Sequence, residues 1–188
     1  QGEDAYLARQ PYFREQPAFL MRETGVHLLD VFRSLFGEVD GLFARLAQLN
    51  PVIAGEDAGI VLLGFEGGVH ATFDGNRLAD HAADNPRLVM GELRIEGEDG
   101  TLTLDGDGRI RLRAHGEKQP IAHAYAFDDI DFGGDCVYRC CEHILAHLNT
   151  GSALQNTARD YLVNRRLEAL VYRSHREQRW LDAGGIHG

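Results

Sequence analysis

The sequence is short of cysteine, of basic residues and of long apolar runs, and each shortage excludes a class of protein. Its three cysteines, Cys136, Cys140 and Cys141, are an odd and clustered set, which makes a poor disulfide framework. Reduced thiols therefore predict a cytoplasmic location. The 19 Lys and Arg against 29 Asp and Glu give a net charge of -10, which disfavours nucleic acid and anionic membranes as partners. No apolar run reaches the length of a membrane span, and the first residues do not have the character of a signal peptide.

The glycine-rich fingerprint of dinucleotide-binding domains is also missing. That fingerprint, Gly-x-Gly-x-x-Gly, joins a strand to a helix whose N-terminus binds the pyrophosphate. Residues 64–68 and 106–108 are rich in glycine, but both segments have the pattern of turns between strands. The sequence therefore predicts no cofactor-binding site in this chain.

What the sequence does contain predicts a globular α+β protein. It has 188 residues, of which 44% are hydrophobic and 26% charged. We expect one domain over residues 1–182 and a flexible tail over 183–188. A helix is predicted over residues 23–36, strands follow within residues 39–113, and two helices are predicted over 135–148 and 157–173.

This order predicts a mainly antiparallel open sheet with helices on one face. In the strands between residues 93 and 113, Leu102, Leu104, Ile110 and Leu112 alternate with polar residues, so one face is expected to be packed. The face of the open sheet that the helices leave uncovered is predicted to be an oligomer interface.

The candidate catalytic residues lie on the first predicted helix. Glu23, His27 and Asp30 are spaced by four and three residues, which brings them to one side of a helix. Histidine exchanges protons near neutral pH, and a neighbouring carboxylate can fix its tautomer. The alternative is an acidic first turn that favours the helix dipole, with a hydrogen-bonded core histidine.

A second stripe, on the helix over 135–148, contains Cys136, Cys140, His143 and His147. Pairs of these side chains could chelate zinc, and a metal-dependent hydrolase is one hypothesis. However, four ligands on one straight helix cannot surround a tetrahedral ion. The sequence therefore favours small core or interface residues here, and we predict no metal site.

The first helix carries a pattern of the form acidic-x-Gly-x-His-x-x-Asp-x-x-Arg-x-x-x-Gly, represented by Glu23, Gly25, His27, Asp30, Arg33 and Gly37. This pattern resembles the C-terminal domains of the glucose-fructose oxidoreductase/inositol dehydrogenase/MocA (Gfo/Idh/MocA) family. The turn over residues 95–102 and the helical segments 156–162 and 168–174 resemble the same family. The resemblance covers most of residues 10–182.

The resemblance implies the substrate-binding and oligomerising domain of an NAD- or NADP-dependent oxidoreductase that acts on a sugar, polyol or related hydroxy compound. The nicotinamide would be bound by an N-terminal Rossmann domain, so no cofactor is expected on this chain. His27 and Glu23 are the predicted catalytic residues, and Arg22, His27 and Tyr161 the predicted substrate-binding residues. The chain is also expected to self-associate through the open sheet. A non-catalytic α+β binding or oligomerisation module is the alternative.

Overall fold

The computed structural model describes residues 7–127, 130, 133–155 and 157–186. Contacts between residues divide the chain into two compact units, residues 1–79 with 156–188, and residues 80–155. The sequence alone predicts one domain over 1–182.

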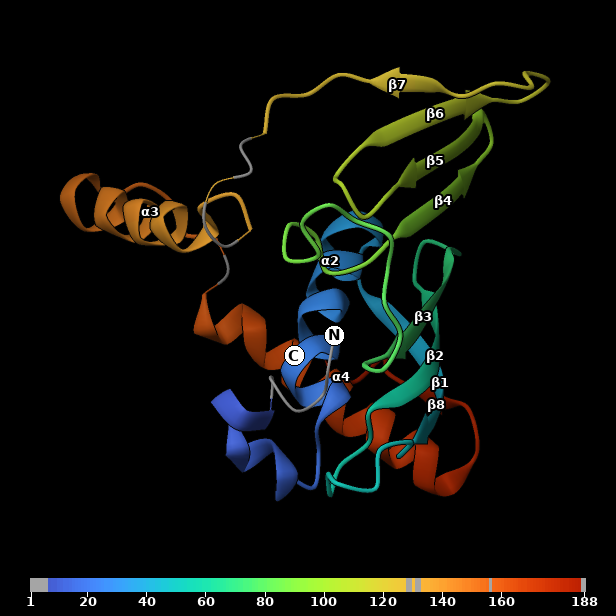
Figure 1. Cartoon of the computed structure of the whole chain (residues 1–188), viewed down its shortest axis with the longest axis vertical. Coiled ribbons are helices and arrows are strands. Elements are labelled where there is room, and N and C mark those ends of the chain that lie inside the picture. The colour runs from blue at the N-terminus through green and yellow to red at the C-terminus, as the bar shows by residue number, and fades with distance from the viewer. Residues whose placement is uncertain (1–6, 128–129, 131–132, 156, 187–188) are drawn as a thin grey trace. The chain divides into compact units, whose positions relative to one another are not determined.

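The first unit is built on a four-stranded antiparallel sheet (Figure 1). Its strands are β1 (Val39–Ala47), β2 (Ala58–Phe65), β3 (His70–Asn76) and β8 (Leu181–Asp182), in the order β3-β2-β1-β8. Glu66, Gly67 and Gly68 join β2 to β3, and Gly68 has a φ of 80°, which a glycine adopts without steric cost. The predicted hairpin is therefore confirmed.

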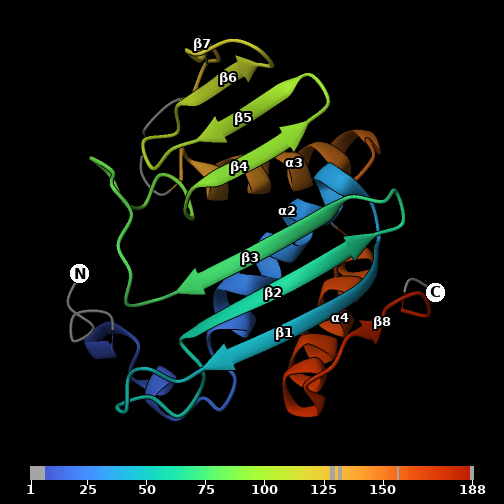
Figure 2. The same cartoon turned by 90° about the vertical axis from the view of Figure 1, so that its right-hand side faces the viewer.

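Two helices cover one face of this sheet (Figure 2). A π-helical turn, η2 (Met21–Gly25), leads directly into α2 (Val26–Phe36), which ends where Gly37 adopts a φ of 88°. The predicted helix and its end are confirmed. Leu29 and Phe32 of α2 are buried, and Phe36 packs edge-on against Phe65 of β2 with ring centroids 5.6 Å apart.

The second helix, α4 (Ala158–Glu177), begins at Thr157, whose side chain accepts a hydrogen bond from the Asp160 N–H. Leu167 and Val171 are fully buried against the sheet. Near the end of α4, Ser174 Oγ accepts a hydrogen bond from the Ala44 N–H at 3.0 Å, and His175 Nδ1 accepts one from the Leu46 N–H at 3.1 Å. These bonds fix α4 along β1.

The other face of this sheet carries exposed apolar side chains. Ile60 and Leu62 of β2 are 46% and 41% exposed, and Trp180, just before β8, is 47% exposed. The indole of Trp180 occupies the space that a Cβ would need at Gly41 and approaches Gly64 as well. Ala183, at the start of the predicted tail, is buried, and its N–H donates to the Asp40 carbonyl at 2.7 Å.

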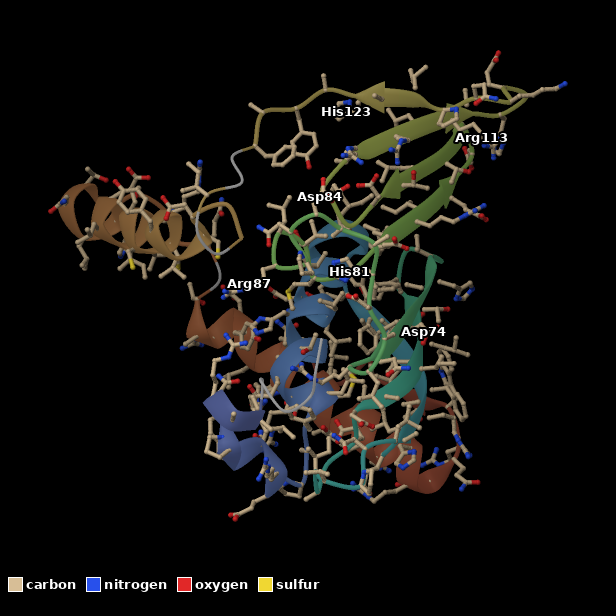
Figure 3. All side chains as sticks on the ribbon, in the orientation of Figure 1. Asp74, His81, Asp84, Arg87, Arg113 and His123 are labelled. Carbon is tan, nitrogen blue, oxygen red and sulfur yellow. The ribbon has the colours of Figure 1, made fainter. Side chains whose placement is uncertain are left out.

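The second unit contains a separate antiparallel sheet and one helix. Its strands are β4 (Leu93–Gly97), β5 (Gly100–Leu104), β6 (Ile110–Ala114) and β7 (Ile121–His123), followed by α3 (Cys136–Thr150). The predicted α+β class with antiparallel strands is confirmed, and its strands are divided between two sheets, because irregular residues 77–92 separate β3 from β4 and the strands β4 to β7 pair with one another. Figure 3 labels His81, Asp84 and Arg87 on that segment, with Arg113 on β6 and His123 on β7.

The predicted packed face of this second sheet is not found. Leu102, Leu104 and Ile110 are only half-buried, and Leu112 is 37% exposed. Within the described part of residues 80–155, no apolar side chain is buried. Alternation along the strands identified which side chains share a face, but it carries no information on what covers that face. Among the described helices, none combines the length and the hydropathy needed to cross a bilayer.

Candidate active site

The histidine of the motif lies at the surface. His27 is exposed on the first turn of α2, and no described residue forms a hydrogen bond or ion pair with it. Glu23, half-buried in η2, accepts a hydrogen bond from Gln16 Nε2 at 3.0 Å. The structure thus places Glu23 and His27 one turn apart but does not pair them. His27 is free to meet a ligand from solvent.

Asp30 of the motif belongs to a polar network between α2 and α4. Asn164 of α4 is fully buried; its Nδ2 donates to Asp30 Oδ1 at 2.6 Å, and its Oδ1 accepts from Arg33 Nη1 at 2.9 Å. Arg33 also donates to both carboxylate oxygens of Glu38, at 2.7 and 2.6 Å. The hydrogen bond to Glu38 raises the pKa of Arg33 despite its partial burial.

This network holds the helix that presents His27. Arg33 Nη1 and Asp30 Oδ1 are 3.9 Å apart, at the predicted spacing of three residues. The bidentate contact with Glu38 fixes the plane of the guanidinium. Asp30 and Arg33 therefore position α2 against α4, and their polar atoms are engaged with protein groups.

A second network lies further along the same junction. Glu168 of α4 is 2% exposed and forms ion pairs with Arg22 of η2, at 3.1 Å, and with Arg165. The two arginine side chains are 43% and 41% exposed. Although Arg165 approaches Glu168 Oε2, that oxygen accepts no hydrogen bond of good geometry, so the pair is electrostatic.

Tyr161 lies between the two networks. Burial raises the pKa of its phenol, and the nearby charge of Asp30 acts in the same direction. The phenol therefore stays protonated and can donate a hydrogen bond. The structure brings two predicted substrate-binding residues, Arg22 and Tyr161, to the same helix junction.

The junction ends at a buried carboxylate in the loop before β2. Glu56 accepts hydrogen bonds from the N–H groups of Phe19 and Met21, at 3.1 and 3.0 Å, and from the hydroxyl of Tyr172. Burial, followed by the bond to Glu56, raises the pKa of Tyr172 far above its usual value. This carboxylate fixes the start of η2, because two of its partners are backbone groups.

Sequence reasoning missed Asn164, Arg165, Glu168 and Glu56. The residues of α4 fall at positions 161, 164, 165 and 168, which share one side of a helix. That spacing was available in the sequence. The residues that these α4 side chains contact could not be read from the sequence, since Arg22 and Glu168, for example, are 146 residues apart.

Among the described residues, the cysteine and histidine stripe of α3 does not bring three or more His, Cys, Asp or Glu side chains into a group that could hold an ion. The three cysteines are exposed and form no disulfide. His143 Nε2 accepts a hydrogen bond from the Gln155 N–H at 3.0 Å, and His147 Nδ1 contacts the Ser152 carbonyl. The two histidines thus hold the loop after the helix. The sequence favours core or interface residues here; the core role is contradicted, because α3 has no buried residue, and the interface role stays a prediction.

The first unit thus carries the complete motif on η2 and α2, beside the polar junction between α2 and α4. The chain belongs to the GFO/IDH/MocA family: the model of the GFO/IDH/MocA C-terminal domain matches residues 3–103. The resemblance seen in the sequence is therefore confirmed.

Two curated relatives cover nearly the whole chain. It is 31% identical over 183 residues to D-apiose dehydrogenase from Paraburkholderia graminis, a match that spans 92% of this chain and 47% of that protein. It is 25% identical over 182 residues to D-apiose dehydrogenase from Rhizobium rhizogenes, spanning 94% of this chain and 52% of the relative. The chain thus spans about half the length of these relatives.

Solved structures share the fold. An oxidoreductase from Agrobacterium radiobacter, in complex with NAD+, L-tartaric acid and magnesium, superposes with a TM-score of 0.82 at 23% identity, over 96% of this chain and 54% of that one. A levoglucosan dehydrogenase in complex with NADH and L-sorbose gives a TM-score of 0.70 at 14% identity, over 88% of this chain and 50% of the other.

Proposed function

We propose that this chain is the substrate-binding part of an NAD- or NADP-dependent dehydrogenase that oxidises a hydroxyl, or reduces a carbonyl, on a sugar or polyol. The observation that carries the proposal is the exposed, unpaired His27 on a helix whose family motif is complete. The names of the two curated relatives support a sugar as the substrate, and the solved complexes with NAD+ and NADH support a nicotinamide.

Neither glycine-rich turn of this chain has the geometry that binds the pyrophosphate of a nicotinamide dinucleotide. Residues 66–68 form a turn between two strands, in which the Gly68 N–H donates to the Phe65 carbonyl at 2.8 Å. The turn at residues 105–109 likewise joins β5 to β6, and its Asp105 side chain accepts the N–H groups that a phosphate would need. Neither turn opens a helix, so the cofactor would be held elsewhere in the parent protein.

Within this chain, His27 has the role of proton acceptor. A hydroxyl that becomes a carbonyl loses its proton as well as a hydride, and an imidazole at the surface of α2 can take that proton. Glu23 lies one turn before His27 and can hydrogen-bond the substrate or the imidazole once a ligand is present. Arg22 and Tyr161 supply hydrogen-bond donors for other oxygens of the substrate.

The test is His27→Ala in the parent protein, with His70→Ala as the matched control, since His70 is an exposed histidine on β3. Loss of a general base lowers turnover by about 100-fold or more. We expect that loss for His27→Ala, with an unchanged circular dichroism spectrum, and normal turnover for His70→Ala. Unchanged turnover of His27→Ala would remove this histidine from the mechanism. Calorimetry with NADH and the 188-residue chain should show no binding. Tight binding would refute the proposal that the nicotinamide is held by another part of the parent protein.

We also propose self-association through the outer face of the sheet β3-β2-β1-β8. Ile60, Leu62 and Trp180 supply exposed apolar surface on this face. Leu62→Lys should shift the chain toward the monomer in sedimentation velocity, whereas Val52→Lys, in an exposed loop, should not. A chain that is already monomeric at high concentration would refute the interface.

A further inference from the structure

A buried carboxylate with two half-exposed arginines is an arrangement that the proposed reaction does not by itself require. A carboxylate that is 2% exposed is costly to bury unless cations pair with it. Glu168 meets this condition with two arginines that come from different helical segments, Arg22 from η2 and Arg165 from α4. Glu168 thus draws two guanidinium groups together at the surface of the α2–α4 junction.

Most of the donors of these guanidinium groups are unused. Each arginine has five N–H donors in a plane, and Glu168 is met by Nε of Arg22 and by Nη1 of Arg165. No other partner of either side chain is found among the described residues. Each of the two side chains is more than 40% exposed, so both arginines are accessible from solvent. Planar groups of donors are the geometry that matches a carboxylate.

The surrounding charges leave this pair available to an anion. Two arginines against one glutamate leave a net charge of about +1 on the trio. Asp30 is paired with Arg33, and Glu56 is 8% exposed and engaged with backbone N–H groups and Tyr172. Glu23 is directed to Gln16. Since the partners of Glu23 and Glu56 are neutral groups, the attraction for a carboxylate comes from the unused guanidinium donors and not from a local excess of positive charge.

We propose that Arg22 and Arg165 bind the carboxylate of the substrate, so that the parent enzyme acts on a sugar acid or a similar hydroxy acid. This inference rests on the proposed dehydrogenase function and replaces a neutral sugar or polyol by the corresponding hydroxy acid as the substrate class. Arg22 and His27 lie on adjoining turns, η2 and the start of α2, and the proposal requires the hydroxyl-bearing carbons of the bound acid to reach the imidazole. Glu168 is a positioning residue, because it touches the two arginines and is shielded from the ligand.

The test is a titration of the 188-residue chain with sodium D-gluconate and with D-gluconamide, which has the same carbon skeleton without the charge. Binding is measured by calorimetry and by the NMR shifts of the arginine Nε–H groups. A charge-assisted contact with a carboxylate predicts binding of gluconate at least about tenfold tighter than gluconamide. It also predicts shifts confined to Arg22 and Arg165.

Variants separate the arginine pair from simple charge attraction. Arg22→Gln combined with Glu168→Gln keeps the local net charge and leaves no buried carboxylate unpaired, so the fold is preserved. We expect this double variant to lose at least about tenfold in gluconate affinity. Arg173→Gln is the control, because Arg173 is an exposed arginine of α4 that pairs with Glu177; it should bind gluconate normally.

Three results would overturn the proposal: equal binding of gluconate and gluconamide, unchanged gluconate affinity in the double variant, or inorganic phosphate that binds these arginines as tightly as gluconate. None of them bears on His27, whose failure would appear in the turnover of the parent protein. Equal binding of the amide would leave a neutral sugar as the substrate.

Discussion

The carboxylate of Glu56 offers a stringent test of the packing around the motif. It accepts three hydrogen bonds, from the Phe19 N–H at one oxygen and from the Met21 N–H and the Tyr172 hydroxyl at the other. In Glu56→Gln one oxygen becomes an NH2 group. Whichever oxygen is kept, the amide nitrogen then faces a buried backbone N–H.

The expected cost follows from this count. An unsatisfied buried donor costs about 1–3 kcal/mol, and the bonds to the oxygen that is kept lose their charge assistance. We expect Glu56→Gln to lower the free energy of unfolding by about 2–4 kcal/mol, a large part of the 5–15 kcal/mol typical of a domain. Tyr172→Phe removes one donor, and its effect should be much smaller in the Glu56→Gln background than alone.

Urea denaturation followed by the fluorescence of Trp180 is the appropriate assay, since the chain has one tryptophan and it lies in the unit that contains Glu56. Glu66→Gln, at an exposed glutamate of the β2–β3 turn, is the matched control and should change stability by less than about 0.5 kcal/mol. If Glu56→Gln were as mild as this control, the assignment of Glu56 as the anchor of η2 would be refuted.

Three further predictions concern single groups. Asn164→Ala should destabilise the first unit by about 2–3 kcal/mol in the same urea assay, because it leaves Asp30 and Arg33 without their buried link, and a loss below 0.5 kcal/mol would contradict this. Burial opposes ionisation of Asp105, but hydrogen bonds from the Arg109 N–H, Arg111 and the Asp107 N–H lower its pKa below the usual 3.8. Its stabilising effect is therefore present above that pH and lost as the pH falls through the lowered pKa, which an NMR titration of its carboxyl carbon would measure and a normal pKa would refute. Because the pKa of Tyr172 is raised above 10.0, its contribution to stability is intact below pH 10 and declines as the pH rises further; Tyr172→Phe should flatten this decline, and an equal decline in both proteins would contradict it.

Local patterns in the sequence predicted the local structure well. The spacing of apolar residues and Gly37 predicted α2 and its end, and Gly67 with Gly68 predicted the β2–β3 turn. These features depend on neighbours in the chain, which hydrophobic periodicity and turn chemistry describe directly. The α+β class follows from the same information.

Features that depend on distant residues could not be predicted. Arg33 and Asn164 are 131 residues apart, and Tyr172 and Glu56 are 116 apart. A single sequence gives no register between such segments, so Glu23 and His27 were paired with each other by spacing, whereas the structure bonds Glu23 to Gln16. The same limit explains the division into two sheets and the lack of burial along α3.

The indole of Trp180 over Gly41 and Gly64 also has a consequence for evolution. A side chain at position 41 would need the space that the indole occupies, and at position 64 a Cβ would come within 3.3 Å of it and collide with Asp40. Substitution at 41 is therefore tolerated only together with a smaller residue at 180, whereas substitution at 64 also requires the Asp40 side chain to move. Across homologous sequences, we expect these three positions to change together, with glycines retained wherever tryptophan is retained.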